Sequence, residues 1–378
     1  MISKKSVQFV YLLIFIVISI WLIDYFDLCF SSNKIQTSSN KLSTPLIVLW
    51  TGWFHVYDRN LFDVYTTMPR DCRYKCKVIR RERLIKYPNI VPSAYIFHAW
   101  NISLNDLPSS RYNHQLFIFF NQEPPTNLLD KDVYKLPRNF FNATMTYNLD
   151  SDYFYPYHLI EPISNQSDSI YILSEEKIKE KLKYKKNGAF FVASNCHGMQ
   201  SQRDYYIAKL RKYTNMTLKG QCFSKKKLND EQFKELADSH RFYLSFENSL
   251  CRDYITEKFY RRMFNLNVPV VLNGNILKDN PNVPKGSYIS ASDFKSPKEL
   301  GDYLKYLTVN DTEYLKYFEW TKKYTTRSRP RNDMCKMCKD LHLKKKKTVD
   351  FIDYFMHGQC ISPSKKSDKI FDKVNQRV

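Results

Sequence analysis

The chain has 378 residues, of which 43% are hydrophobic and 16% aromatic, so it can bury substantial cores and is not a disordered protein. It contains only 8 glycines and neither a GxGxxG nor a GxxxxGK[ST] motif, which excludes the usual glycine-rich phosphate loops. The formal net charge of +21 favours an anionic partner: a nucleic acid, an anionic membrane or a phosphate-bearing substrate.

The N-terminal residues predict a membrane anchor. Residues 1–6 form a short basic tail, and residues 7–23 are apolar except for Gln8 and Ser19. This is about the shortest stretch that crosses a bilayer as a helix, and the positive charge before it places the rest of the chain in a lumen. A cleaved signal peptide is the alternative, although the stretch is long for one and no A-x-A-like site follows. The lumenal topology argues against a nucleic-acid partner.

The following residues agree with a lumenal position. Residues 24–44 are predicted to be a flexible stem, because they are largely polar and lack apolar periodicity toward the end. Nine cysteines indicate a partly oxidised set, in which Cys29, beside the membrane, is the odd one. The sequons that predict N-glycosylation are Asn101, Asn142, Asn165, Asn215 and Asn310.

Two α/β domains are expected after the stem, at residues 45–185 and 186–343, followed by a basic C-terminal tail at 344–378. Alternating strands and helices predict parallel, doubly wound sheets, whose ligands bind at the carboxyl ends of the strands. A charged helical segment at 175–186 is a candidate linker. The expected strands are 46–51, 95–100, 116–120, 189–194, 216–219, 242–246 and 268–272, and the expected helices are 203–213, 231–238, 256–266 and 297–307.

A polar cluster follows the strand predicted at 242–246. It precedes a helix whose N-terminus offers free N–H groups and a positive dipole end, which together suit an anion. Lys258 in the first turn opposes that dipole, so its position makes sense if a dianionic group binds beside it. An ordinary surface lysine is the alternative. The cluster consists of Glu247, Asn248, Asp253, Tyr254, Thr256, Glu257 and Lys258.

At these residues the chain resembles the α1,3-fucosyltransferase family (glycosyltransferase family 10), whose members are type II Golgi membrane enzymes. The segments FYLSFENS at 242–249, DYITEKFYRRMF at 253–264 and VPVVLNG at 268–274 are similar to the family's donor-site signature. Further matching segments bring the resemblance to roughly residues 46–343. They are NATMTYNLDSDYFYPY at 142–157, VASN at 192–195 with Arg203, and residues 288–307.

The resemblance implies a GT-B-like fold, with two Rossmann-like domains facing across a cleft. It also implies inverting transfer of fucose from GDP-fucose to the O3 of a GlcNAc in a glycan. Arg203 and Lys258 match positions that hold the diphosphate, and fixed cations suit the negative charge that develops on departing GDP. No cofactor is implied for the chemistry, with a divalent cation such as Mn²⁺ at most stimulating it. The positions that match residues around the nucleotide and fucose are Glu247, Asn248, Tyr254 and Glu257.

Glu123 is the candidate base for the acceptor hydroxyl. It follows a predicted buried strand in FFNQEPP at 119–125; such a glutamate is usually only a loop residue, but the resemblance implies a catalytic glutamate here. The chain has Pro124 where the family usually has serine. Asp150 and Asp152 resemble a Mn²⁺-binding DxD motif, but they lie in the acceptor half and are interpreted as loop carboxylates, so no metal site is predicted.

The close cysteine pair Cys335 and Cys338 has no second CxxC at zinc-ribbon distance, which makes a zinc or redox site a poor interpretation. The resemblance implies disulfides from this pair to Cys72 and Cys76. Another candidate pair, on either side of one strand–helix–strand unit, is Cys196 and Cys222.

The sequence therefore predicts a single-pass type II Golgi fucosyltransferase with its catalytic part in the lumen. The acceptor remains open between a LacNAc-type or LacdiNAc-type glycan and the Asn-linked core GlcNAc. A catalytically inactive, glycan-binding relative is the alternative from another class, and an intact set of site residues argues against it. That set is Glu123, Arg203, Glu247 and Lys258.

Overall fold

The computed structural model describes residues 44–52, 68, 72–164, 167, 172–195, 199–224, 226–326 and 333–361. The described residues form one compact unit apart from residues 87–90, a turn in which the Ile90 N–H donates to the Tyr87 carbonyl. The expected tail, membrane span and most of the stem, residues 1–43, lie outside the described residues. Within the described part, every helix is too short or too polar to span a bilayer.

The first sheet has six parallel strands in the order β2-β1-β3-β4-β5-β6. Its central strands β3 and β4 are buried along their whole length, which explains their continuous apolar sequence. The strand bounds are Leu46–Leu49 for β1, Lys77–Arg80 for β2, Ala94–His98 for β3, Leu116–Asn121 for β4, Ala143–Thr146 for β5 and Tyr153–Phe154 for β6. Short 3-10 helices lie at Arg81–Lys86, Ala99–Asn101, Pro125–Asn127 and Asp132–Lys135.

The second sheet has five parallel strands in the order β12-β11-β10-β8-β9. The predicted alternation of strands and helices is confirmed here, within a few residues at each end. The strands are β8 Asn187–Val192, β9 Met216–Lys219, β10 His240–Leu244, β11 Val268–Val271 and β12 Ile289–Ser290. The helices are α4 Arg203–Leu210, α5 Gln221–Ser224, α6 Asp230–Ser239, α7 Glu257–Phe264, α8 Pro297–Val309 and α9 Asp311–Leu315. The 3-10 helices of this region are Gly274–Ile276, Ala291–Asp293 and Lys316–Lys322.

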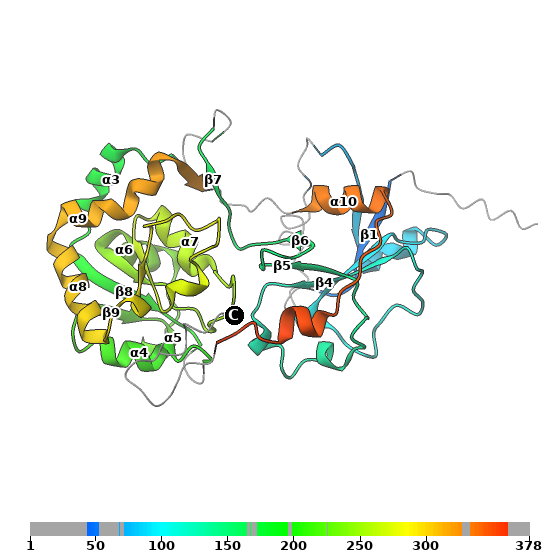
Figure 1. The fold of residues 1–378 in the computed structure, drawn as a ribbon, viewed down its shortest axis with the longest axis horizontal. Helices are drawn as coiled ribbons and strands as arrows, with labels where there is room; N and C mark the ends of the chain where they lie inside the picture. Colours follow the sequence, from blue (N-terminus) through cyan, green and yellow to red (C-terminus); the bar gives the residue numbers. More distant parts are fainter. Residues whose placement is uncertain are drawn as a thin grey trace, which may run out of the picture. The chain divides into compact units, whose positions relative to one another are not determined.

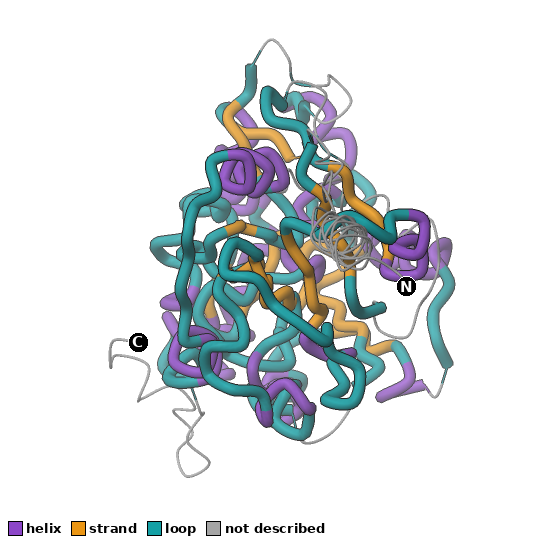
Figure 2. Tube along the Cα trace, turned by 90° about the vertical axis from the view of Figure 1, so that its right-hand side faces the viewer, coloured by secondary structure: helices purple, strands orange, loops and turns teal. Residues whose placement is uncertain are grey.

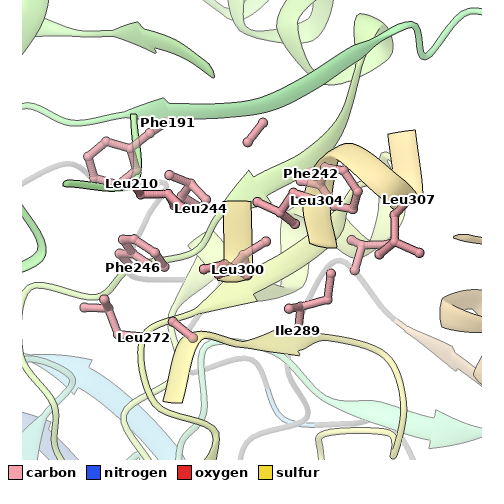
Figure 3. Packing of buried hydrophobic residues seen from close by; sticks show 14 of the residues in the cluster. Phe191, Leu210, Phe242, Leu244, Phe246, Leu272, Ile289, Leu300, Leu304 and Leu307 are labelled. Carbon is pink, nitrogen blue, oxygen red and sulfur yellow. The ribbon is translucent and has the colours of Figure 1, made fainter. Parts of the chain in front are cut away.

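Both faces of the second sheet are covered by helices. Figure 1 shows these helices around the strands, and Figure 2 shows the chain turned by 90°. On one face, Leu210 of α4 and Leu300 and Leu304 of α8 pack with Phe242 and Leu244 of β10 (Figure 3). On the other, Tyr243 packs with α6. Neighbouring residues of β10 therefore point to opposite faces, and both faces are apolar, as expected for a doubly wound sheet.

The boundary between the two parts differs from the prediction at residues 185/186. Helix α3 (Glu175–Leu182) buries Ile178 and Leu182 in the core of the second sheet, so it is not a linker. Strand β7 (Ile160–Pro162) pairs antiparallel with β13 (Tyr324–Thr326), and both belong with the second sheet's elements. The two strands are short and far apart in the sequence, so no local sequence pattern predicts that they pair.

The C-terminal residues correct the predicted boundary at 343/344. Helix α10 (Met334–His342) buries Met334, Met337, Cys338 and Leu341 in the core of the first sheet, not the second; Figure 1 shows α10 beside β1.

The residues predicted as a basic tail also return to the first sheet. Phe355, in the π-helical turn η9 (Ile352–Met356), lies 5.0 Å from Phe119 between ring centroids, and Phe351 lies 5.0 Å from Phe141. The four rings are almost completely buried, so residues up to at least 356 complete a core and are not a solvated tail.

Two leucines near the end of α10 can test whether this helix packs on the first sheet. Leu341 is buried in that core, whereas Leu343, two residues later, is exposed. We expect Leu341→Ala to lower the free energy of unfolding by about 2–5 kcal/mol because it leaves a cavity, and Leu343→Ala to change it by no more than about 0.5 kcal/mol. Urea unfolding of the two variants checks this; equal effects would contradict the assignment of α10 to the core.

Candidate active site

The Glu247 carboxylate organises the N-terminus of α7. It follows β10, is buried, and accepts hydrogen bonds from the backbone N–H of Thr256 at 2.9 Å and from its hydroxyl at 2.8 Å. Lys258 Nζ lies 3.1 Å from the other Glu247 oxygen and 3.0 Å from Thr256 Oγ1. Glu247 therefore fixes both the cap of the helix and the direction of the Lys258 side chain.

Lys258 is positively charged within this arrangement. Burial disfavours its charge, but the carboxylates of Glu247 and Glu257 outweigh burial and raise the pKa of the ammonium above its ordinary value. The helix dipole alone would make this position unfavourable for a cation. The two carboxylates are the physical reason that a lysine is stable there.

Arg203 is the second cation. It begins α4 after Gln202, whose backbone is left-handed at a φ of 51°. Its guanidinium donates to the Phe246 carbonyl at 2.9 Å and to the Asn195 carbonyl at 3.0 Å. Burial lowers the pKa of this guanidinium, and the Glu247 carboxylate partly offsets this decrease. No carboxylate among the described residues forms an ion pair with Arg203, so its charge is held in place by carbonyls and is not neutralised.

A pocket of about 480 Å³ lies at the carboxyl ends of β8 and β10, the edge of a parallel sheet at which ligands bind. Five basic side chains line it, against two carboxylates, which gives it the charge expected for an anionic ligand. Its lining includes the predicted residues Arg203, Asn248, Glu257 and Lys258, and also Asn195, Asp230, Phe233, Lys234, Tyr243, Arg261 and Arg262. Arg261 and Arg262 were not identified from the sequence, although they lie in the matched segment at 253–264.

Glu123 follows β4, as the sequence predicted. Its carboxylate accepts a hydrogen bond from the Asn127 amide at 2.8 Å. Burial raises the pKa of Glu123, Lys258 lowers it, and Glu257 and Glu247 raise it again. These electrostatic couplings place Glu123 near the donor-motif residues, although it comes from the first sheet.

Tyr254 lies apart from the pocket lining. It is buried and packs against Tyr147 and Tyr157, with ring centroids 5.1 and 6.2 Å away. The Tyr157 hydroxyl donates to the carbonyl of Gln122, the neighbour of Glu123, at 2.9 Å. Tyr254 therefore packs against residues that surround Glu123.

The two carboxylates of the DSD segment have separate partners. Asp150 pairs with Arg252 at 2.9 Å. Asp152 accepts from the Thr144 N–H at 2.9 Å and pairs with Lys347 at 2.7 Å. The described ranges contain no group of three or more His, Cys, Asp or Glu side chains that could hold a metal ion.

Disulfides join Cys72 to Cys335 and Cys76 to Cys338, as the resemblance implied. Cys222 is also disulfide-bonded, whereas Cys196 lies outside the described residues, so that pairing stays a prediction. A further disulfide, which was not predicted from the sequence, joins Cys360 to Cys251, between the donor-motif segments at 242–249 and 253–264. Once Cys29 was set aside as the odd cysteine, these two were the only ones left unassigned, and elimination would have paired them.

The sequon asparagines differ in the hydrogen bonds that their side-chain amides make. Asn142 donates to the Gln115 carbonyl at 3.0 Å and accepts from the Phe117 N–H at 2.8 Å, so its amide is bonded to the N-terminal end of β4. Asn310 caps α9 and donates to the Tyr306 hydroxyl at 2.9 Å.

Asn215 is exposed, and its amide makes no hydrogen bond to any residue that the structure describes. The Asn101 amide oxygen lies 2.8 Å from Nδ1 of the buried His98, and Asn165 lies outside the described residues.

Comparison with known proteins identifies the class of this fold. A crystal structure titled as an α1,3-fucosyltransferase superimposes with a TM-score of 0.50 at 18% identity, covering 80% of this chain and 91% of that one. The chain thus shares an α/β fold with parallel sheets with that enzyme.

The family follows from sequence. Residues 42–158 match the family model "Fucosyltransferase, N-terminal", and residues 182–354 match "Glycosyltransferase family 10 (fucosyltransferase) C-term". The chain is 34% identical to the 3-galactosyl-N-acetylglucosaminide 4-α-L-fucosyltransferase of Pan troglodytes, over 82% of this chain and 79% of the relative. It is 30% identical to the α-(1,3)-fucosyltransferase C of Drosophila melanogaster, over 79% and 74%. The chain belongs to glycosyltransferase family 10, the fucosyltransferases.

The sequon geometry yields a prediction about modification. When the chain is secreted from a eukaryotic host, we expect Asn215 to carry a glycan and Asn142 to be unmodified, because the Asn142 amide is hydrogen-bonded to the backbone at the start of β4. Site-resolved mass spectrometry after enzymatic deglycosylation in ¹⁸O water measures both. Asn215→Gln should remove one glycan in a gel-mobility assay, and Asn142→Gln none; high occupancy at Asn142 would oppose the prediction.

Proposed function

We propose that this protein transfers L-fucose from GDP-fucose to the O3 of a GlcNAc residue in a glycan, with inversion at the sugar carbon. The observation that carries the proposal is the cationic pocket at the strand ends, where Arg203 and Lys258 occur together near Glu123. Membership of a fucosyltransferase family and the relative named as an α-(1,3)-fucosyltransferase support it.

In the proposed mechanism, the Glu123 carboxylate takes the proton from the acceptor hydroxyl as that oxygen attacks C1 of fucose. The bond between C1 and the phosphate oxygen breaks, and the electron pair leaves with GDP. Lys258 and Arg203 are held before the donor arrives, so they stabilise the charge that develops on the diphosphate without reorganising. Glu247 acts by positioning Lys258.

We assign Glu257 and Asn248 to the donor side because both line the pocket. The buried Asn248 Oδ1 has no hydrogen-bond partner among the described residues, as expected for a group that a ligand satisfies. We place Tyr254 with Tyr147 and Tyr157 beside Glu123, where they keep water from the base.

The proposal includes a GT-B arrangement of the two sheets across a cleft, and a type II Golgi enzyme anchored by residues 7–23. No cofactor is needed for the chemistry, and a divalent cation such as Mn²⁺ enters only as a stimulant. Nothing favours the inactive, glycan-binding alternative, because the carboxylates and cations of the site are all present. Assay of the lumenal part with GDP-fucose on a glycan array, with linkage analysis of the product, tests the activity and decides between LacNAc-type, LacdiNAc-type and core acceptors.

Glu123→Gln tests the base. The amide has the same size but cannot accept the proton, so we expect transfer to fall by roughly 10²–10⁴-fold. GDP affinity should be retained, since the phosphate ligands come from the second sheet. Asp150→Asn and Asp152→Asn are the matched controls, and collapse of transfer in one of them alone would move the base to the DSD segment.

The pH dependence adds a second measurement for the same residue. Because the folded-state pKa of Glu123 is raised, its deprotonated form dominates only above the ordinary range of a glutamate. The acid limb of the kcat/KM profile should therefore lie above pH 4.5, the ordinary value for the side chain, and vanish in Glu123→Gln.

Lys258→Ala and Arg203→Lys test the donor site. Loss of a charge-assisted phosphate contact costs roughly 1.5–3 kcal/mol, so we expect Lys258→Ala to weaken GDP binding correspondingly. Arg203→Lys keeps the charge but loses the planar fork and should have a smaller effect in the same direction. Lys298→Ala, on the exposed face of α8, is the control. Unchanged GDP affinity in calorimetry for both site variants would rule out the assignment.

A further inference from the structure

The guanidinium of Arg262 is buried, and no carboxylate of the described residues forms an ion pair with it. The residue is only 8% exposed, and within the described residues Arg262 has no salt bridge and its Nε has no hydrogen-bond acceptor. Its contacts are aromatic: the guanidinium carbon lies 3.9 Å from the ring centroid of Phe233 and 5.0 Å from that of Tyr243. A buried, unpaired cation is costly, so its presence in a pocket wall points to a ligand that supplies the acceptors.

The charge of Arg262 persists despite this environment. Burial lowers its pKa to about 10, Tyr243 and Glu257 act to raise it, and the neighbouring Arg261 lowers it. The group is still protonated at neutral pH. The pocket therefore presents a forked donor that no described protein acceptor satisfies.

The position of Arg262 separates it from the diphosphate ligands. Lys258 and Arg262 are four residues apart on α7, so they share one face of the helix and differ by about 6 Å along its axis. Lys258 lies at the strand ends with Arg203, whereas Arg262 lies one turn further along, between α6 and α7. The side chains that contact its guanidinium are Phe233 of α6 and Tyr243 of β10, so its immediate surroundings are aromatic.

We propose that Arg262 recognises the guanine base of the donor nucleotide, by donating hydrogen bonds to O6 and N7. Arginine is the side chain best suited to this edge of guanine, which presents two acceptors, whereas adenine presents one acceptor and one amino donor at the same positions. Phe233 and Tyr243 hold the guanidinium in place by cation–π contact. This inference rests on the proposed function and assigns the residue that selects GDP-fucose over other nucleotide sugars.

A third phosphate contact is the competing role for Arg262. The aromatic surroundings favour the base, because a diphosphate gains nothing from Phe233 and Tyr243, whereas the flat face of a purine packs well against such surfaces. The two roles predict different nucleotide dependence, which makes them separable.

The experiment compares affinities for GDP, ADP and pyrophosphate by calorimetry in wild type, Arg262→Met and Arg262→Lys. The control is Arg211→Met, at the exposed C-cap of α4 and outside the pocket lining. We expect Arg262→Met to weaken GDP at least tenfold and to leave ADP and pyrophosphate within twofold, so that the preference for GDP over ADP is lost. Arg262→Lys should weaken GDP several-fold, because one ammonium cannot make both hydrogen bonds. Equal weakening of GDP and ADP, or restoration of GDP binding by lysine, would instead assign Arg262 to a phosphate, and unchanged GDP binding would make it structural.

Stability provides a further readout. Methionine keeps the hydrocarbon stem and removes the unpaired charge, so the melting temperature of ligand-free Arg262→Met should equal or exceed that of wild type; a marked decrease would oppose the inference. Should this variant not fold, Arg262→Lys with the same nucleotides decides. Fucose transfer by the wild type, measured in parallel, tests the proposed function separately. If the wild type transfers fucose and Arg262→Met still prefers GDP over ADP, the inference about Arg262 is wrong while the proposed function stands.

Discussion

The contact between Glu247, Thr256 and Lys258 is the interaction on which the site depends. One buried carboxylate accepts from the first N–H and the hydroxyl of the helix cap and holds an ammonium with its other oxygen. Without that carboxylate, a lysine in the first turn would face the positive end of α7 unopposed. The end of β10, the start of α7 and the direction of Lys258 are thereby fixed together.

The other cations of the pocket follow a different principle. Arg203 is held by carbonyl oxygens and Arg262 by aromatic rings, so neither charge is cancelled by a described carboxylate. Groups oriented in this way bind an anion or an acceptor-rich base with little rearrangement, which is the condition for strong electrostatic stabilisation in a desolvated site. The cost is a set of buried charges that the ligand-free protein leaves partly unsatisfied.

Much of the second sheet and its helices could be predicted from the sequence, because strands such as β10 and β11 are continuous apolar runs between helices with clear periodicity. The carboxyl-end position of Glu247 and Lys258 followed from that order. The membership of α10 could not be predicted, since an amphipathic helix reveals its apolar face but not the sheet that will cover it. The β7–β13 pair and the role of Tyr254 depend on contacts between distant residues. The environment of Arg262 also depends on tertiary packing. The sequence shows two adjacent arginines, and only the packing of α6 distinguishes the buried Arg262 from the exposed Arg261.

The return of α10 and η9 to the first sheet has a consequence for biosynthesis. The core that begins with β1 receives Met337 and Phe355 only after every residue of the second sheet has been translated. An emerging chain must therefore keep a partly exposed apolar surface while some 170 residues of intervening sequence fold. The first part is therefore not a contiguous stretch that can be excised, and early termination of translation would damage the half of the protein that was made first.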